Sequence, residues 1–103
     1  MNLTDENFEA EIKNAKKPVL VDFFAVWCEP CNMLAPVLKK VSDELKDKII
    51  LEKVNVDEFP ITSQKFQIDR IPAVILFKDG KPAGGFIGVR PEADIKNWLE
   101  KEL

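Results

Sequence analysis

The sequence contains no histidine and only two cysteines. Histidine is the side chain whose charge most readily changes near neutral pH, so its absence excludes the acid/base and metal mechanisms that depend on an imidazole. Long runs of one charge sign are also missing. The net charge is -3, and no run of like charges exceeds a few residues. The sequence therefore lacks the basic surface typical of proteins that bind nucleic acid or anionic membranes, and we expect neither as a partner.

The sequence also lacks the hydrophobic segments of membrane and exported proteins. No apolar stretch approaches the length of a membrane span. The first seven residues have neither a basic start nor an apolar core, so no signal peptide is expected. We therefore expect a cytoplasmic protein, in which a disulfide is more often catalytic than structural. The 103 residues, 46% of them hydrophobic and 32% charged, suffice for one packed core, so residues 1–103 are expected to form a single domain.

The two cysteines lie close together in the segment Trp27-Cys28-Glu29-Pro30-Cys31. This segment follows an apolar run at residues 19–25, which indicates a buried strand, and precedes a helical pattern at residues 32–45. Positions i and i+3 of a first helical turn face the same way, so two sulfurs there can form a short disulfide without backbone movement. The free amide groups of a helix N-terminus favour a thiolate at the first cysteine. Cys28 is therefore the candidate nucleophile and Cys31 its resolving partner.

Three other interpretations of the cysteine pair compete with redox chemistry. A structural disulfide closing so short a loop would remove little entropy from the unfolded chain and would stabilise the fold weakly. A zinc half-site would need carboxylates or a second chain, because the sequence offers only two soft ligands. Two incidental thiols would more often be scattered along the chain. The spacing and context favour redox chemistry over all three.

Helical and extended patterns alternate along the chain. A helix is expected at residues 5–15, capped by Thr4 or Asp5. After the strand at 19–25, the expected elements are a helix at 32–45 that contains Pro36, a strand at 49–56, a short helix at 60–66, a strand at 73–77, an Asp79-Gly80 hairpin turn, a strand at 84–88 and a helix at 92–103. This order predicts an α/β protein, a three-layer α/β/α sandwich with a parallel sheet core and one antiparallel hairpin.

Asp22 interrupts the apolar strand that ends just before Cys28. Its neighbours on both sides are apolar, so we expect it to be buried rather than at a solvated edge. Burial disfavours the charged carboxylate and should raise its pKa, which would let it exchange a proton near neutral pH. Lys53, in the next apolar strand, is the cation expected to approach Asp22, although it could also be an ordinary surface lysine. Trp27 could be a core aromatic, but beside a nucleophile we expect it to form part of the rim of the site.

The stretch from Val21 to Cys31 resembles the active-site stretch of thioredoxins. The similarity covers nearly the whole chain and continues through Met33, Pro36, the strand at 53–57, Arg70-Ile71-Pro72, the segment at 77–80 and Gly88. It implies the thioredoxin fold, with a mixed sheet of four main strands, four helices and an N-terminal edge strand. Because only Met1, Asn2 and Leu3 precede the expected cap, that edge strand should be vestigial, with a contact of at most two or three residues.

The resemblance also implies the function. It implies exchange of a dithiol with the disulfides of client proteins, no bound cofactor, no metal, and electrons supplied by thioredoxin reductase; we expect a monomer. Asp22 would assist Cys31 through a water, with Lys53 beside it. Clients would dock on a surface formed by Trp27, Glu29, Pro30, Ile71, Pro72, Gly88 and Val89, with a cis bond between Ile71 and Pro72. Two residues depart from the family pattern, which most often has Gly at position 29 and Thr at position 73.

Overall fold

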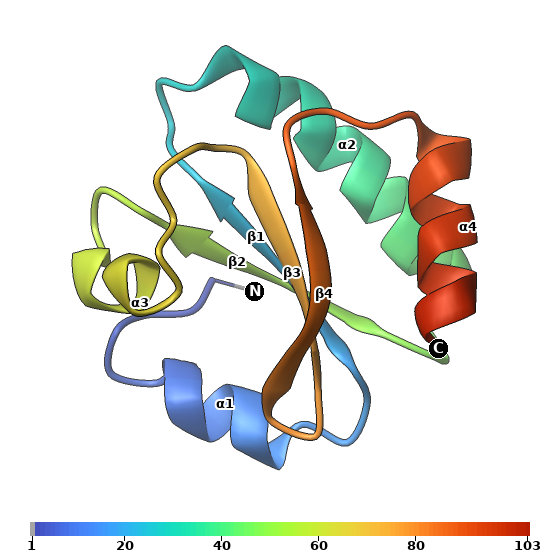
Figure 1. Ribbon diagram of the computed structural model, residues 1–103, viewed down its shortest axis with the longest axis horizontal. Helices are drawn as coiled ribbons and strands as arrows, with labels where there is room; N and C mark the ends of the chain where they lie inside the picture. The colour runs from blue at the N-terminus through green and yellow to red at the C-terminus, as the bar shows by residue number, and fades with distance from the viewer. Residues whose placement is uncertain (1) are drawn as a thin grey trace.

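The computed structural model describes residues 2–103, which form a four-stranded sheet with helices on both faces (Figure 1). The elements along the chain are α1 (Phe8–Asn14), β1 (Val19–Phe24), α2 (Glu29–Glu44), β2 (Ile50–Asn55), α3 (Pro60–Lys65), β3 (Ala73–Lys78), β4 (Lys81–Ile87) and α4 (Glu92–Glu102). The four helices and four main strands confirm the expected α/β/α architecture. No helix among residues 2–103 is both long enough and apolar enough to cross a membrane.

The sheet has the strand order β2-β1-β3-β4. β1 pairs in parallel with β2 and antiparallel with β3, and β3 and β4 form an antiparallel hairpin. The sheet is therefore mixed, with one parallel pair, and the expectation of a parallel core with antiparallel pairing only in the hairpin was wrong. Helices α2 and α4 lie on one face of the sheet, and α1 and α3 lie on the other (Figure 1). The parallel connection through α2 puts the carboxyl ends of β1 and β2 at the same edge, where the cysteine segment begins.

Alternation along β1 decides which side of the sheet each of its side chains faces. Leu20 packs in the core beneath α2 and α4, whereas Val21 and Phe23 pack in the core on the α1 and α3 side. Asp22 and Phe24 share the parity of Leu20, so they face the helix layer that carries the cysteines. The strand therefore directs a carboxyl group toward the α2 side of the core, just upstream of the redox pair.

The start of the first helix differs from the expectation. α1 begins at Phe8 with Asn7 as its N-cap, and no side chain caps it. Thr4 instead closes a preceding turn with Asn7: its hydroxyl accepts the Asn7 N–H at 3.2 Å, and its own N–H donates to the Asn7 side chain at 2.8 Å. Asp5 caps α3, because its carboxylate accepts the Thr62 N–H at 2.8 Å and the Thr62 hydroxyl at 2.7 Å. The helix predicted in this segment is therefore confirmed, but it begins at Phe8 rather than Asp5, and the prediction that Thr4 or Asp5 caps it was wrong.

The remaining boundaries are close to the predicted ones, with two differences. α2 begins at Glu29, earlier than its hydrophobic stripe, and it continues through Pro36. β4 begins at Lys81 rather than near residue 84. Asp79 and Gly80 both have positive φ, 54° and 81°, so they close a two-residue hairpin turn after which pairing resumes at once.

The N-terminal edge strand is vestigial, as expected. Asn2 makes a single parallel bridge to Lys53, and the Leu3 N–H donates to the Lys53 carbonyl at 2.7 Å. Met1, which the expectation also included, lies outside the described residues.

Candidate active site

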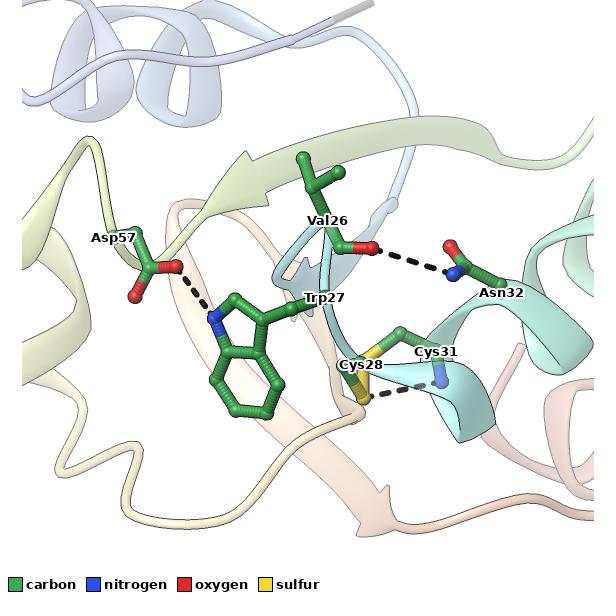
Figure 2. Close-up of a disulfide and its surroundings, with 6 residues drawn as sticks. All are labelled: Val26, Trp27, Cys28, Cys31, Asn32 and Asp57. Atoms are coloured by element: carbon green, nitrogen blue, oxygen red, sulfur yellow. Dashed lines mark hydrogen bonds between the residues drawn. A yellow bond between two sulfur atoms is a disulfide. The ribbon is translucent and has the colours of Figure 1, made fainter.

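Cys28 and Cys31 lie at the N-terminus of α2 and form a disulfide, with Cα atoms 5.2 Å apart (Figure 2). Cys28 is the N-cap residue, and its sulfur accepts a hydrogen bond from the Cys31 N–H at 3.2 Å. Both residues are buried, 4% and 2% exposed, together with Ala25. In the reduced protein the same amide group and the helix dipole would stabilise a thiolate on Cys28.

Trp27 is 72% exposed, which excludes the interpretation that it is a core aromatic. Its indole Nε1–H donates to the Asp57 carboxylate at 2.7 Å, and Figure 2 shows the ring lying between Asp57 and the cysteines. On the other side of the segment, the Asn32 side-chain amide donates to the Val26 carbonyl at 3.3 Å. These two bonds attach the residues before Cys28 to the end of β2 and to the first turn of α2. Asp57 was not among the predicted site residues.

Asp22 is fully buried, as its apolar neighbours predicted. No protein group among residues 2–103 donates a hydrogen bond to either of its carboxylate oxygens. Burial raises the pKa of Asp22 from its usual 3.8 to about 6, and the positive charge of Lys53 opposes part of this rise. The structure thus gives the protein a carboxyl group that changes protonation close to neutral pH.

Lys53 lies opposite Asp22 in the parallel register of β1 and β2. It is half-buried, and its ammonium group lies 5.1 Å from the centre of the Phe24 ring. A cation over an aromatic face is held by the ring quadrupole, so Phe24 fixes the lysine near the site. Lys53 is therefore the register partner of Asp22, and its positive charge lowers the pKa of that carboxyl without a direct hydrogen bond.

Two loops border the cysteines. The Ile71–Pro72 bond is cis, as the resemblance implied, and Ile71 packs against the cluster formed by Ala25 and the two cysteines. The Gly88 N–H donates to the Pro72 carbonyl at 2.8 Å, and Gly88 has a φ of 87°, where glycine is favoured over other residues. The structure therefore joins the two loops that the sequence assigned to the docking surface.

The exposure of the expected docking residues is uneven. Val89 is 41% exposed, and Glu29 and Pro30 are also exposed at the start of α2, whereas Pro72 is buried. Pro72 can thus contribute its backbone and shape the loop, but it does not present an open ring. Among residues 2–103, no group of three or more cysteine or acidic residues is arranged to hold a metal ion.

A redox-active cysteine pair at the first turn of a helix, after the central strand of a mixed α/β sheet, defines a thiol–disulfide oxidoreductase. Comparison with known proteins agrees. The thioredoxin family profile matches residues 1–101. The thioredoxin of Alicyclobacillus acidocaldarius subsp. acidocaldarius is 48% identical over 103 residues, covering 100% of this chain and 97% of that protein.

Two further relatives are similar over nearly their full lengths. The thioredoxin of Rickettsia prowazekii is 39% identical over 99% of this chain and 97% of its own. Thioredoxin C-2 of Corynebacterium nephridii is 40% identical over 100% of this chain and 95% of its own. The chain belongs to the thioredoxin family, and with its Cys28–Cys31 disulfide it is a dithiol–disulfide oxidoreductase.

In the reduced protein, Cys28 should be alkylated before Cys31. The two side chains are almost equally buried, so the difference should come from the N-cap position, where Cys28 receives the Cys31 amide N–H. Brief treatment with iodoacetamide at neutral pH, followed by peptide mass spectrometry, locates the label. Preferential labelling of Cys31 would reverse the roles assigned to the two cysteines.

Removing the charge of Glu29 should make Cys28 more reactive. The carboxylate of this neighbouring residue, in a mostly aqueous setting, disfavours the Cys28 thiolate by about 0.5–1 kcal/mol, so Glu29→Gly should raise the alkylation rate at pH 7 about threefold. Glu29→Gln is the matched control, because it keeps the side chain and removes only the charge. An increase with Gly but none with Gln would attribute the effect to the backbone instead.

Proposed function

We propose that this protein reduces disulfide bonds of client proteins, with Cys28 as the attacking group. The observation that carries the proposal is the N-cap position of Cys28, whose sulfur accepts the amide N–H of Cys31. In the first step, the Cys28 thiolate attacks one sulfur of a client disulfide. The client S–S bond breaks, a Cys28–client disulfide forms, and the other client sulfur leaves as a thiolate that takes a proton.

The second step releases the client. The Cys31 thiol transfers its proton to the Asp22 carboxylate through a water, and its sulfur attacks Cys28. The Cys28–Cys31 disulfide forms and the second client sulfur departs as a thiolate, so the client has gained two electrons. A carboxyl with a pKa of about 6 is largely ionised at pH 7 and can accept this proton. Lys53 lowers the pKa of Asp22, because its ammonium group favours the ionised carboxylate.

The client would dock on the exposed surface around the disulfide. Trp27, Glu29, Pro30 and Val89 offer exposed side chains, and Ile71 lies against the cysteine cluster. Pro72 and Gly88 hold the two bordering loops together. A client segment could then lie in extended form beside the backbone of Ile71, bringing its disulfide to Cys28.

Membership of the thioredoxin family supports the remaining parts of the proposal. We propose that residues 1–103 act as one thioredoxin-like domain and as a monomer, without a cofactor, because the cysteines themselves carry the electrons. Thioredoxin reductase would return them to the dithiol state. We place the reaction in the cytoplasm, because repeated donation of electrons from a dithiol needs a reducing pool.

The reduction of insulin by dithiothreitol tests this proposal. Reduced insulin chains precipitate, so a thiol–disulfide oxidoreductase should accelerate the appearance of turbidity at catalytic concentrations. A thioredoxin-like binding module that kept the cysteine pair without using it would leave the rate unchanged. That result would overturn the proposed function.

A further inference from the structure

The turn at residues 55–59, which joins β2 to α3, is held by a set of hydrogen bonds made by Asn55. Asn55 is the last residue of β2 and is 8% exposed. Its side-chain carbonyl accepts the N–H groups of Asp57 and Glu58 at 2.9 and 3.2 Å. Its side-chain amide donates to the Glu58 carboxylate at 3.1 Å, and its backbone carbonyl accepts the Phe59 N–H at 2.9 Å.

These bonds fix the place of the Asp57 backbone. A buried asparagine that satisfies successive N–H groups with its side chain and main chain closes an Asx turn and holds it in one conformation. Asn55 also continues the β1–β2 ladder, since it pairs with Phe24, and the following Val56 N–H donates to the Phe24 carbonyl at 2.8 Å. The turn is therefore built on β2 and its parallel neighbour β1, the strand that carries Asp22 and leads to Cys28.

Asp57 in turn holds the indole of Trp27. Because Trp27 is 72% exposed, packing restrains little of its ring, and the 2.7 Å bond from Nε1 to Asp57 is a specific restraint on the ring's orientation. Figure 2 shows that the bond comes from the side of the ring away from α2. A displacement of the Asp57 backbone would thus be transmitted to an exposed aromatic ring adjacent to Cys28.

We infer that Asn55 is a positioning residue for client binding: through Asp57 it fixes the orientation of the Trp27 ring in the client-docking surface. The inference rests on the proposed function and goes beyond it, because it assigns a role to a buried amide that touches neither cysteine. Reduction of client proteins large enough to contact Trp27 should depend on Asn55. Reduction of small disulfides that contact only the cysteine sulfurs should not.

The test compares Asn55→Ala with the unchanged protein by two independent readouts. In the oxidised protein labelled with ¹⁵N, the indole N–H resonance of Trp27 should shift, while that of Trp98, which packs on Phe86, should stay in place. The kcat/KM for insulin should fall about fivefold through a higher KM, which is the size of effect expected from losing the hydrogen bond between Trp27 and Asp57. The rate with a small aromatic disulfide should change by less than about twofold.

Two further variants separate positioning from general loosening. In Asn55→Asp/Glu58→Gln the side chain at 55 still accepts both N–H groups and the side-chain bond to residue 58 is kept with donor and acceptor exchanged, so both readouts should return to the wild-type values. Asp5→Ala removes the cap at the N-terminus of the same α3 helix without touching Asn55, and it should lower stability while leaving the Trp27 resonance and the insulin KM unchanged.

An unshifted Trp27 resonance in Asn55→Ala would overturn the inference. So would a shifted resonance with an unchanged insulin KM, or an equal loss with protein and small disulfides. Failure of the unchanged protein to reduce insulin would instead refute the proposed function, and the indole comparison would still decide whether Asn55 positions Trp27.

Discussion

Replacing Cys31 with serine should stop turnover and leave the client covalently attached to Cys28. The Cys28 thiolate can still attack a client disulfide, because the helix N-terminus that favours it is unchanged. The hydroxyl of serine cannot form a disulfide, so the mixed disulfide is not resolved. We expect insulin reduction at limiting dithiothreitol to fall on the order of a thousandfold, with accumulation of an adduct.

Non-reducing electrophoresis and intact-protein mass spectrometry measure this adduct. The matched control is Cys28→Ser, which keeps Cys31 in its buried position in the first turn and should capture no client. If Cys28→Ser trapped the client as efficiently as Cys31→Ser, the two cysteines would have the opposite roles. If neither variant trapped it, the mixed-disulfide mechanism would be wrong.

Replacing Asp22 with alanine should make the protein more stable at pH 8 while slowing release of the client. The carboxylate is fully buried and accepts no hydrogen bond from the described residues, so its charge is held at a cost. The rise in its pKa from 3.8 to about 6 corresponds to ~3 kcal/mol at pH values above both. Lost packing around the missing carboxyl offsets part of this, so we expect a net gain in unfolding free energy of about 2 kcal/mol.

The sign of the pH dependence follows from the raised pKa. Between pH 3.8 and about 6 the folded protein holds the Asp22 proton more tightly than the unfolded chain does, so its stability decreases as pH rises and becomes constant above about 6. The advantage of Asp22→Ala should therefore be large at pH 8 and shrink toward pH 4. Urea unfolding at several pH values measures it, and a variant less stable than wild type at pH 8 would show that Asp22 is a satisfied structural carboxylate.

Lys53→Met provides a separate check on Asp22. The lysine charge lowers the pKa of Asp22, so its removal should raise that pKa further and extend the pH-dependent loss of stability to higher pH. In the Asp22→Ala background the same lysine substitution should leave the pH profile unchanged. A shift that persisted without Asp22 would mean that Lys53 acts through some other titrating group.

The sequence predicted the parts of the site whose chemistry depends on spacing along the chain. The redox role of the cysteine pair was predicted from its position between a strand and a helix. The burial of Asp22 was predicted from its apolar neighbours on β1. The helix at the cysteines was expected to start later, because its hydrophobic stripe begins only with Leu34. In the first turn of this helix only the cysteines are buried, whereas Glu29, Pro30 and Asn32 are exposed, so hydrophobic periodicity does not reveal it.

The contacts that the sequence did not predict join segments far apart in the chain. Asp5 is of a residue type that often caps the helix directly after it. Here it instead caps α3 by accepting the N–H of Thr62, 57 residues further along the chain. Asp57 meets Trp27 across 30 residues, and only the parallel pairing of β1 and β2 brings them together. An acidic residue at the carboxyl end of a strand parallel to β1 was the available signal for Asp57, because such ends meet at one edge of the sheet.

The central claim is that Cys28 and Cys31 together carry two electrons to a protein disulfide. In the most direct measurement, the fully reduced protein is mixed with an oxidised client protein in the absence of any other reductant. The reaction is quenched with acid, and the masses of both proteins are measured by mass spectrometry. We predict that one client disulfide is reduced for each chain that becomes about 2 Da lighter through an intramolecular Cys28–Cys31 bond. A client that stays oxidised, or one that is reduced while this chain keeps both thiols, would contradict the account.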